Sequence, residues 1–139
     1  RLGIGSDSHV SLDVVEELRL LEYGQRLVRQ RRNCLQNGDT RQVGDWLYRH
    51  ALAGGAQASG QPIGAIAPGM RADLVILDGD DPYLATASDE TRLGRWLFGG
   101  SKQQIRDVMV AGRWVVEARR HPLDANNQAA LTRLFRELG

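Results

Sequence analysis

The sequence contains a single cysteine, Cys34, and no long run of apolar residues. One cysteine cannot form a disulfide within the chain, so a disulfide-held scaffold is excluded and a reducing, cytoplasmic setting is expected. The lack of a long apolar run excludes a transmembrane helix. Neither sign of charge dominates, with 18 lysines and arginines against 17 aspartates and glutamates. This balance predicts no general affinity for nucleic acid or for an anionic membrane.

What is present is the composition of an ordinary globular protein. The 139 residues are 42% hydrophobic, which is enough for one domain with its own core. The chain opens on Arg1-Leu2-Gly3 without a methionine or a secretory signal, and this opening reads as the inside of a structural element. We therefore expect the sequence to begin within a longer protein.

The first residues predict a strand that ends in a polar turn. Residues 2–5 form a short glycine-rich strand pattern, and Ser6-Asp7-Ser8-His9 follows directly. A buried parallel strand needs neighbours, and no other strand pattern occurs before Pro62, so its partners are expected upstream. In an α/β barrel the C-terminal ends of the strands carry the chemistry. Asp7 is thus suited to binding a metal or accepting a proton, and the alternative is that it caps the next turn.

Two helices are predicted next. Ser11 or Asp13 is suited to cap the first helix, and Thr40 the second, with the turn Asn37-Gly38-Asp39 between them. In the second helix, Gly54-Gly55 either breaks the helix or lets it pack closely. Basic residues crowd the end of the first helix: Arg26, Arg29, Arg31 and Arg32. They form either a phosphate or carboxylate site or a solvated helix end, and the balanced net charge favours the solvated end.

From Pro62 the pattern changes from helix to strand. Strands are predicted at 63–66 and 74–77, with a turn at Pro68-Gly69 and a short helix or turn at 91–98. Two further strands at 105–110 and 113–116 are joined by Ala111-Gly112, which is typical of a hairpin. Asp124 is expected to cap a final amphipathic helix that packs back on the rest of the protein.

Three segments, in this order and spacing, resemble the amidohydrolase superfamily. They are Gly5-Ser6-Asp7-Ser8-His9, residues 54–78, and residues 108–116. The resemblance implies an α/β fold, namely the C-terminal end of a metal-dependent TIM-barrel hydrolase. Residues 1–58 would be the last strand and helices of the (β/α)8 barrel, residues 59–119 part of a small β-sandwich, and residues 120–139 a C-terminal helix.

Several shorter segments of the sequence resemble one group of enzymes within this superfamily. Residues 6–11, 14–19 and 21–27, together with residues 80–85 and 95–98, are similar to the deiminases of histidine degradation that act on a formimidoyl amino acid. This resemblance implies hydrolysis of a C=N bond with release of ammonia. It also implies one zinc ion, held by histidines on earlier strands and by Asp7.

The resemblance assigns roles to the polar turn. Asp7 would be both a metal ligand and the catalytic proton acceptor. Ser8 and His9 would face the substrate or orient the metal ligand, and for His9 a structural loop contact is an equal alternative. The paired His-x-His of the superfamily's first strand is absent, because His9, His50 and His121 lie far apart. We therefore expect this chain alone to be inactive and to bind metal weakly.

Two other interpretations stay open at the level of the sequence. One is another amidohydrolase, a deaminase or chlorohydrolase that acts on a heterocycle, because the C-terminal module is shared among these enzymes. The other is a non-catalytic β-rich module that binds a partner. The expected partners are a small-molecule substrate and the upstream part of the same enzyme, with no nucleic acid or membrane; a homodimer stays open.

Overall fold

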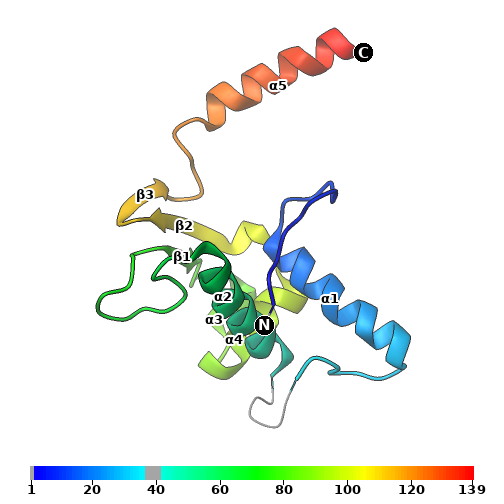
Figure 1. Cartoon of the computed structure of the whole chain (residues 1–139). Coiled ribbons are helices and arrows are strands. Elements are labelled where there is room, and N and C mark those ends of the chain that lie inside the picture. Colours follow the sequence, from blue (N-terminus) through cyan, green and yellow to red (C-terminus); the bar gives the residue numbers. More distant parts are fainter. Residues whose placement is uncertain (1, 37–41) are drawn as a thin grey trace.

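The computed structural model of the chain describes residues 2–36 and 42–139, in which a layer of helices lies beside a small antiparallel sheet (Figure 1). The elements occur in the order α1 (Val14–Arg29), α2 (Val43–Ser59), β1 (Leu74–Leu77), α3 (Pro82–Ala85), α4 (Asp89–Gly99), the 3-10 helix η1 (Lys102–Gln104), β2 (Ile105–Val110), β3 (Arg113–Val116) and α5 (Asp124–Leu138).

Helix α4 lies at the centre of the core, because α1, α2 and α3 all contact it. The Trp96 side chain of α4 is 1% exposed, and its indole Nε1 donates to the Ser101 carbonyl at 3.0 Å. The buried apolar residues that form this cluster are Val15, Leu18, Val43, Leu47, Leu84, Trp96 and Leu97. Burying each large apolar side chain contributes about 1.5–3 kcal/mol, so this cluster is what holds the helices together.

Glycines allow α2 to pack closely on its neighbours. A Cβ placed on Gly44 would lie 2.5 Å from Gly94 Cα in α4, so the two helix backbones touch at this point. A Cβ on Gly54 would lie 1.7 Å from the Leu2 carbonyl oxygen. Helix α2 runs without interruption through Gly54 and Gly55. Close packing is therefore confirmed for Gly54, whereas a Cβ on Gly55 would meet no atom within 4 Å, and the helix does not break at the pair.

Helix α1 is fixed at its start and along one face. Asp13 is the N-cap and accepts a hydrogen bond from the Val15 amide at 2.9 Å, which decides between the two predicted caps. Arg19, one helical turn after Val15, donates to the Leu97 carbonyl at 2.8 Å and to the Gly100 carbonyl at 2.5 Å. These bonds attach α1 to the C-terminal end of α4.

A buried carboxylate connects α1 to the segment after it. Glu22 is 0% exposed and accepts hydrogen bonds from Arg26 Nε at 2.7 Å, the Cys34 amide at 3.0 Å and the Leu35 amide at 2.9 Å. Burial raises the pKa of the Glu22 carboxyl, but the hydrogen bonds from Arg26, Cys34 and Leu35 outweigh it, and the pKa lies below its ordinary value. Glu22 is thus ionised and fully paired inside the fold.

The sheet has the order β1-β2-β3 and is antiparallel throughout. Leu74 pairs with Met109 between β1 and β2, and Val110 pairs with Arg113 beside the hairpin turn. Ala111 has φ 50° and Gly112 has φ 78°, the two positive values that a two-residue type I′ hairpin requires. The predicted hairpin and the predicted strand at 74–77 are confirmed.

Two predicted strands do not form. Residues 2–5 are extended chain without a ladder partner among the described residues, as expected for a strand whose neighbours are not in the described part of the chain. Residues 63–66 form a loop, because Gly64 has φ 94° and the Arg71 amide closes the loop on the Pro62 carbonyl at 2.7 Å. Within it, the predicted turn is confirmed: Gly69 has φ 83° and Met70 N bonds to Ala67 O.

Helix α5 extends away from the other elements (Figure 1) and buries none of its residues. The surface on which this helix was predicted to pack is not found among the described residues, where the apolar side chains Leu131, Leu134 and Phe135 are exposed. Asp124 is its first residue and not its cap; the carboxylate accepts from the His121 amide at 2.7 Å.

The start of α2 is described only in part. Its N-cap is Gln42, which makes no side-chain capping bond. The predicted turn at residues 37–39 and the predicted cap Thr40 lie outside the described residues.

None of the described helices is both long and apolar enough to span a bilayer.

The contact between Gly44 and Gly94 predicts an asymmetric response to alanine. We expect Gly44→Ala to destabilise the fold by about 1–3 kcal/mol, because its Cβ would overlap the α4 backbone, which cannot move aside cheaply. Gly94→Ala is the matched control, since a Cβ there meets no atom within 4 Å. Thermal unfolding of both variants tests this; equal melting temperatures would contradict it.

Glu22 predicts a pH-dependent contribution to stability. We expect Glu22→Gln to lower the free energy of unfolding by about 2 kcal/mol near neutral pH, because an amide cannot accept all three hydrogen bonds. Because the pKa of Glu22 is lower in the folded protein than in the unfolded chain, ionised Glu22 stabilises the fold at pH values above the unfolded carboxyl pKa of about 4.3. This contribution is lost as the pH falls through the pKa of the folded protein. The stability difference from wild type should therefore shrink in acid. Denaturant unfolding at several pH values measures it, and a difference independent of pH would count against this role.

Candidate functional site

The predicted site residues lie on a tight turn before α1. The His9 amide donates to the Ser6 carbonyl at 2.7 Å, which closes the turn around Asp7 and Ser8. Asp7 has φ 40°, in the left-handed region that aspartate tolerates better than most residues. Asp7, Ser8 and His9 are all exposed. The structure therefore brings the three residues together on one exposed loop.

Glu17, in the first turn of α1, holds this turn in place through His9. His9 Nδ1 lies 2.5 Å from Glu17 Oε1, and the Ser11 hydroxyl donates to Glu16. The Asp13 cap also reaches across to η1, where the Lys102 amide donates to its Oδ2 at 3.3 Å. The loop is consequently attached to a helix end that is itself bonded to the β-rich half of the chain.

Sequence reasoning identified His9 but missed Glu17 as its partner. Glu16 and Glu17 are acidic residues in the first turn of α1, a position that carboxylates favour because of the helix dipole. Because Glu17 lies eight residues after His9 and across the cap, no helical or strand period links the two. Only the fold of the loop over the first turn of α1 makes them neighbours.

The described residues do not complete a metal site. No group of three or more histidine, cysteine, aspartate or glutamate side chains among them is arranged to hold an ion. The Asp7 carboxylate accepts no hydrogen bond from another described residue, so it is available as one oxygen ligand. A zinc site needs about three protein ligands, so the described residues by themselves do not supply one.

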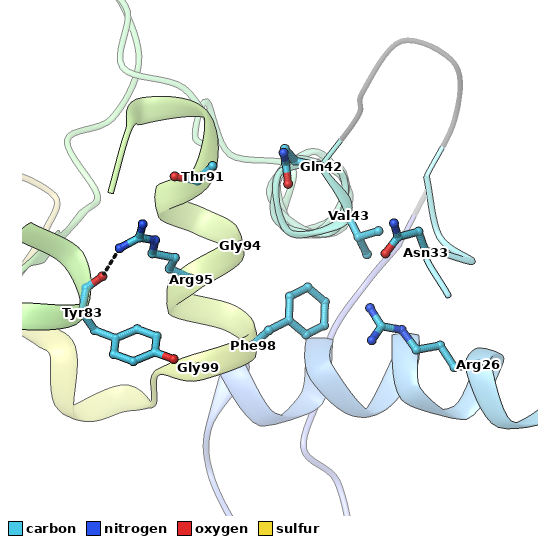
Figure 2. A pocket seen from close by; sticks show the side chains of 10 residues that line it. All are labelled: Arg26, Asn33, Gln42, Val43, Tyr83, Thr91, Gly94, Arg95, Phe98 and Gly99. Carbon is cyan, nitrogen blue, oxygen red and sulfur yellow. Dashed lines mark hydrogen bonds between the residues drawn. The ribbon is translucent and has the colours of Figure 1, made fainter. Parts of the chain in front are cut away.

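The arginines at the end of α1 do not gather into an anion site. Arg29, Arg31 and Arg32 are exposed, as predicted for a solvated helix end. Arg26 instead lines a pocket of 440 Å³ that Arg95 also lines, and Figure 2 shows Arg95 hydrogen-bonded to Tyr83 at this pocket.

Both arginines of this pocket already have partners. Arg26 pairs with Glu22 and lies 5.2 Å from the ring centre of Phe98. Arg95 donates to the Thr86 hydroxyl at 2.7 Å and to the Tyr83 carbonyl at 3.3 Å. The charge of Arg26 is thus paired with a carboxylate, whereas Arg95 is held by hydrogen bonds to neutral oxygens.

A larger groove of 730 Å³ lies between α2 and the sheet. Ile4, Leu52 and Ile63 line one side of it and Val108 and Met109 the other, so its surface is mostly apolar. It adjoins the extended residues before Asp7 but contains no cluster of groups suited to acid–base chemistry. The exposed turn, and not a pocket, is therefore the chemically distinctive feature of the described chain.

His50 behaves as a packing residue, as its place on the apolar side of α2 predicts. Its Nδ1 lies 2.8 Å from the Trp46 carbonyl oxygen, and its ring stacks on the Trp46 indole with centroids 3.9 Å apart. With its ring engaged in this way, His50 does not join Asp7 in a ligand set.

Comparison with known proteins identifies the family. The profile of the amidohydrolase family matches residues 1–115. The chain is 60% identical over 138 residues to formimidoylglutamate deiminase from Pseudomonas aeruginosa, a match that covers 99% of this chain and 30% of that protein.

Solved structures agree with this assignment. An amidohydrolase from Brucella melitensis superposes with a TM-score of 0.83 at 37% identity, covering 98% of this chain and 30% of that one. An adenosine deaminase from Xanthomonas campestris with bound zinc gives 0.73 at 26% identity, covering 96% and 29%.

The chain spans less than a third of the length of each of these relatives. The match nevertheless runs through the polar turn, the helices and the sheet in one continuous stretch. A profile that covers most of the chain and a relative at 60% identity carry the conclusion. The chain belongs to the amidohydrolase family, and the part it resembles includes the turn that carries Asp7.

Proposed function

We propose that this chain is the C-terminal portion of a zinc-dependent formimidoylglutamate deiminase of histidine degradation. The reaction would convert N-formimidoyl-L-glutamate and water into N-formyl-L-glutamate and ammonia. The observation that carries the proposal is 60% identity to a formimidoylglutamate deiminase over 99% of this chain. Because the chain spans 30% of that enzyme, the activity would belong to a longer polypeptide.

The proposal includes an arrangement of the chain within that enzyme. Residues 1–58 would supply the last strand and helices of the barrel, residues 59–119 part of a β-sandwich, and residues 120–139 a C-terminal helix. The three-stranded antiparallel sheet and the extended residues before Asp7 support this division. A cytoplasmic location and one zinc ion per active site belong to the same proposal, and a homodimer remains a hypothesis.

Asp7 would act at the reacting centre. An exposed carboxylate at the end of a barrel strand can take a proton from water while the water oxygen bonds to the amidine carbon. Passing that proton to the leaving nitrogen lets the C–N bond break and ammonia depart. Asp7 would also be one ligand of the zinc, and the other ligands would lie in the upstream part of the polypeptide. Ser8 would contact the substrate from the same turn.

A second candidate is a deaminase of heterocyclic substrates. The structural likeness to an adenosine deaminase with bound zinc favours it, although the identity is only 26%. The same exposed aspartate would suit either reaction, because both add water to a C=N carbon and release ammonia. Assaying the complete polypeptide with formimidoylglutamate and with adenosine, side by side, separates the two candidates by which one yields ammonia.

Replacing Asp7 tests its role in the complete polypeptide. We expect Asp7→Asn to lower kcat for ammonia release about 100- to 10,000-fold, because an amide can neither accept the proton nor carry the ligand charge. We expect Ser8→Ala to change kcat/KM by no more than about tenfold, the effect of one hydrogen bond. Asp89→Asn is the matched control, since that side chain is 94% exposed on α4. Activity of Asp7→Asn equal to that of the control would contradict the role.

The chain by itself is expected to be inactive. Purified residues 1–139 should bind zinc weakly and release no ammonia from formimidoylglutamate, because the described residues offer no group of three metal ligands. The complete polypeptide, measured under the same conditions, is the positive control. Zinc-dependent turnover by residues 1–139 alone would show that the division of the site between this chain and an upstream part is wrong.

A further inference from the structure

The contact with Glu17 fixes the position of the exposed His9 ring. His9 Nδ1 lies 2.5 Å from Glu17 Oε1, and the Glu17 side chain is 14% exposed while that of His9 is 50% exposed. The carboxylate is therefore mostly covered, and the imidazole it holds extends into solvent. His9 stands two residues after Asp7 on the same closed turn.

The chemistry of the pair determines which ring nitrogen carries a proton. An ionised carboxylate only accepts hydrogen bonds, so the proton between the two residues belongs to His9 Nδ1. In a neutral imidazole held this way, Nε2 has no proton and presents a lone pair. Glu17 thus sets both the tautomer and the orientation of the ring, and the exposed nitrogen becomes a hydrogen-bond acceptor.

The support under Glu17 is rigid. Glu17 lies in the first turn of α1, which Asp13 caps, and the Glu17 amide bonds to the Asp13 carbonyl at 3.1 Å. Asp13 in turn accepts from the Lys102 amide of η1. A functional side chain attached to a capped helix end keeps its orientation better than one attached only to a loop.

From these contacts we infer that Glu17 is a positioning residue for His9, and that His9 Nε2 accepts a hydrogen bond from the amidine N–H of the substrate. This inference rests on the proposed deiminase function, because the substrate class comes from it. A formimidoyl group carries N–H donors on the nitrogen that leaves and on the nitrogen that stays. An acceptor beside Asp7 orients that group for attack by water.

The experiment compares Glu17→Gln with Glu16→Gln in the complete polypeptide. Glutamine can turn its amide N–H toward Nδ1 and favour the other tautomer, so we expect kcat/KM with formimidoylglutamate to fall about 10- to 100-fold in Glu17→Gln. Glu16→Gln makes the same chemical change in the same helical turn but holds Ser11 and not His9. We expect it to keep activity within about threefold of wild type, because Ser11 lies outside the turn that the His9 amide closes on Ser6 and the His9 ring is untouched.

A double-variant cycle distinguishes positioning from general stability. In a His9→Ala background, Glu17→Gln should cause no further loss, because Glu17 acts through the ring that is missing. The inference is overturned if Glu17→Gln retains wild-type kcat/KM, if Glu16→Gln loses as much, or if the loss persists in the His9→Ala background.

A spectroscopic measurement keeps the inference testable if the proposed function fails. If the complete wild-type polypeptide releases no ammonia from formimidoylglutamate, the deiminase assignment is refuted, and the proposed substrate contact with it. NMR of the labelled ring nitrogens, with the His9 signal assigned from its absence in His9→Ala, tests the positioning directly. With the ring neutral, wild type should show a proton on Nδ1, and Glu17→Gln should shift it toward Nε2. A proton on Nε2 in wild type would overturn the positioning role.

Discussion

The close crossing of α2 and α4 is the contact on which the rest of the structure depends. Gly44 lets the α2 backbone touch the α4 backbone at Gly94, and this brings Leu47 of α2 and Trp96 of α4 into one buried cluster. Helix α1 then packs on the same cluster through Leu18. A side chain at the crossing would separate the helices, and the apolar contacts, which weaken steeply with distance, would be lost together.

This core positions the candidate site indirectly. Asp7 and His9 are exposed and make no contribution to the core, but the turn that carries them is attached to the first turn of α1. Arg19 and Asp13 attach α1 to the end of α4 and to η1. The chemically reactive groups can therefore stay in solvent while their backbone is held by buried elements, which is the usual division between scaffold and site.

The division of an active site along a chain explains why this segment carries only part of the chemistry. In a barrel, catalytic groups come from the ends of several strands, and each strand end lies in a different part of the sequence. Asp7 is proposed as one such group, and the described residues contain no set of three metal ligands around it. The family assignment covers the turn that carries Asp7, because the match includes residues 1–115.

Short-range patterns in the sequence were sufficient for the hairpin at Ala111-Gly112, and they narrowed the α1 cap to Ser11 or Asp13, because these interactions close within a few residues. The structure then selected Asp13. The role of Asp7 came from family resemblance, and local physics alone left a helix cap as an alternative. Only the tertiary structure decided that Glu17 meets His9 and that residues 63–66 form a loop. The reason is physical: pairings across a cap, a helix crossing or a sheet edge follow from how elements pack, and no local period encodes them.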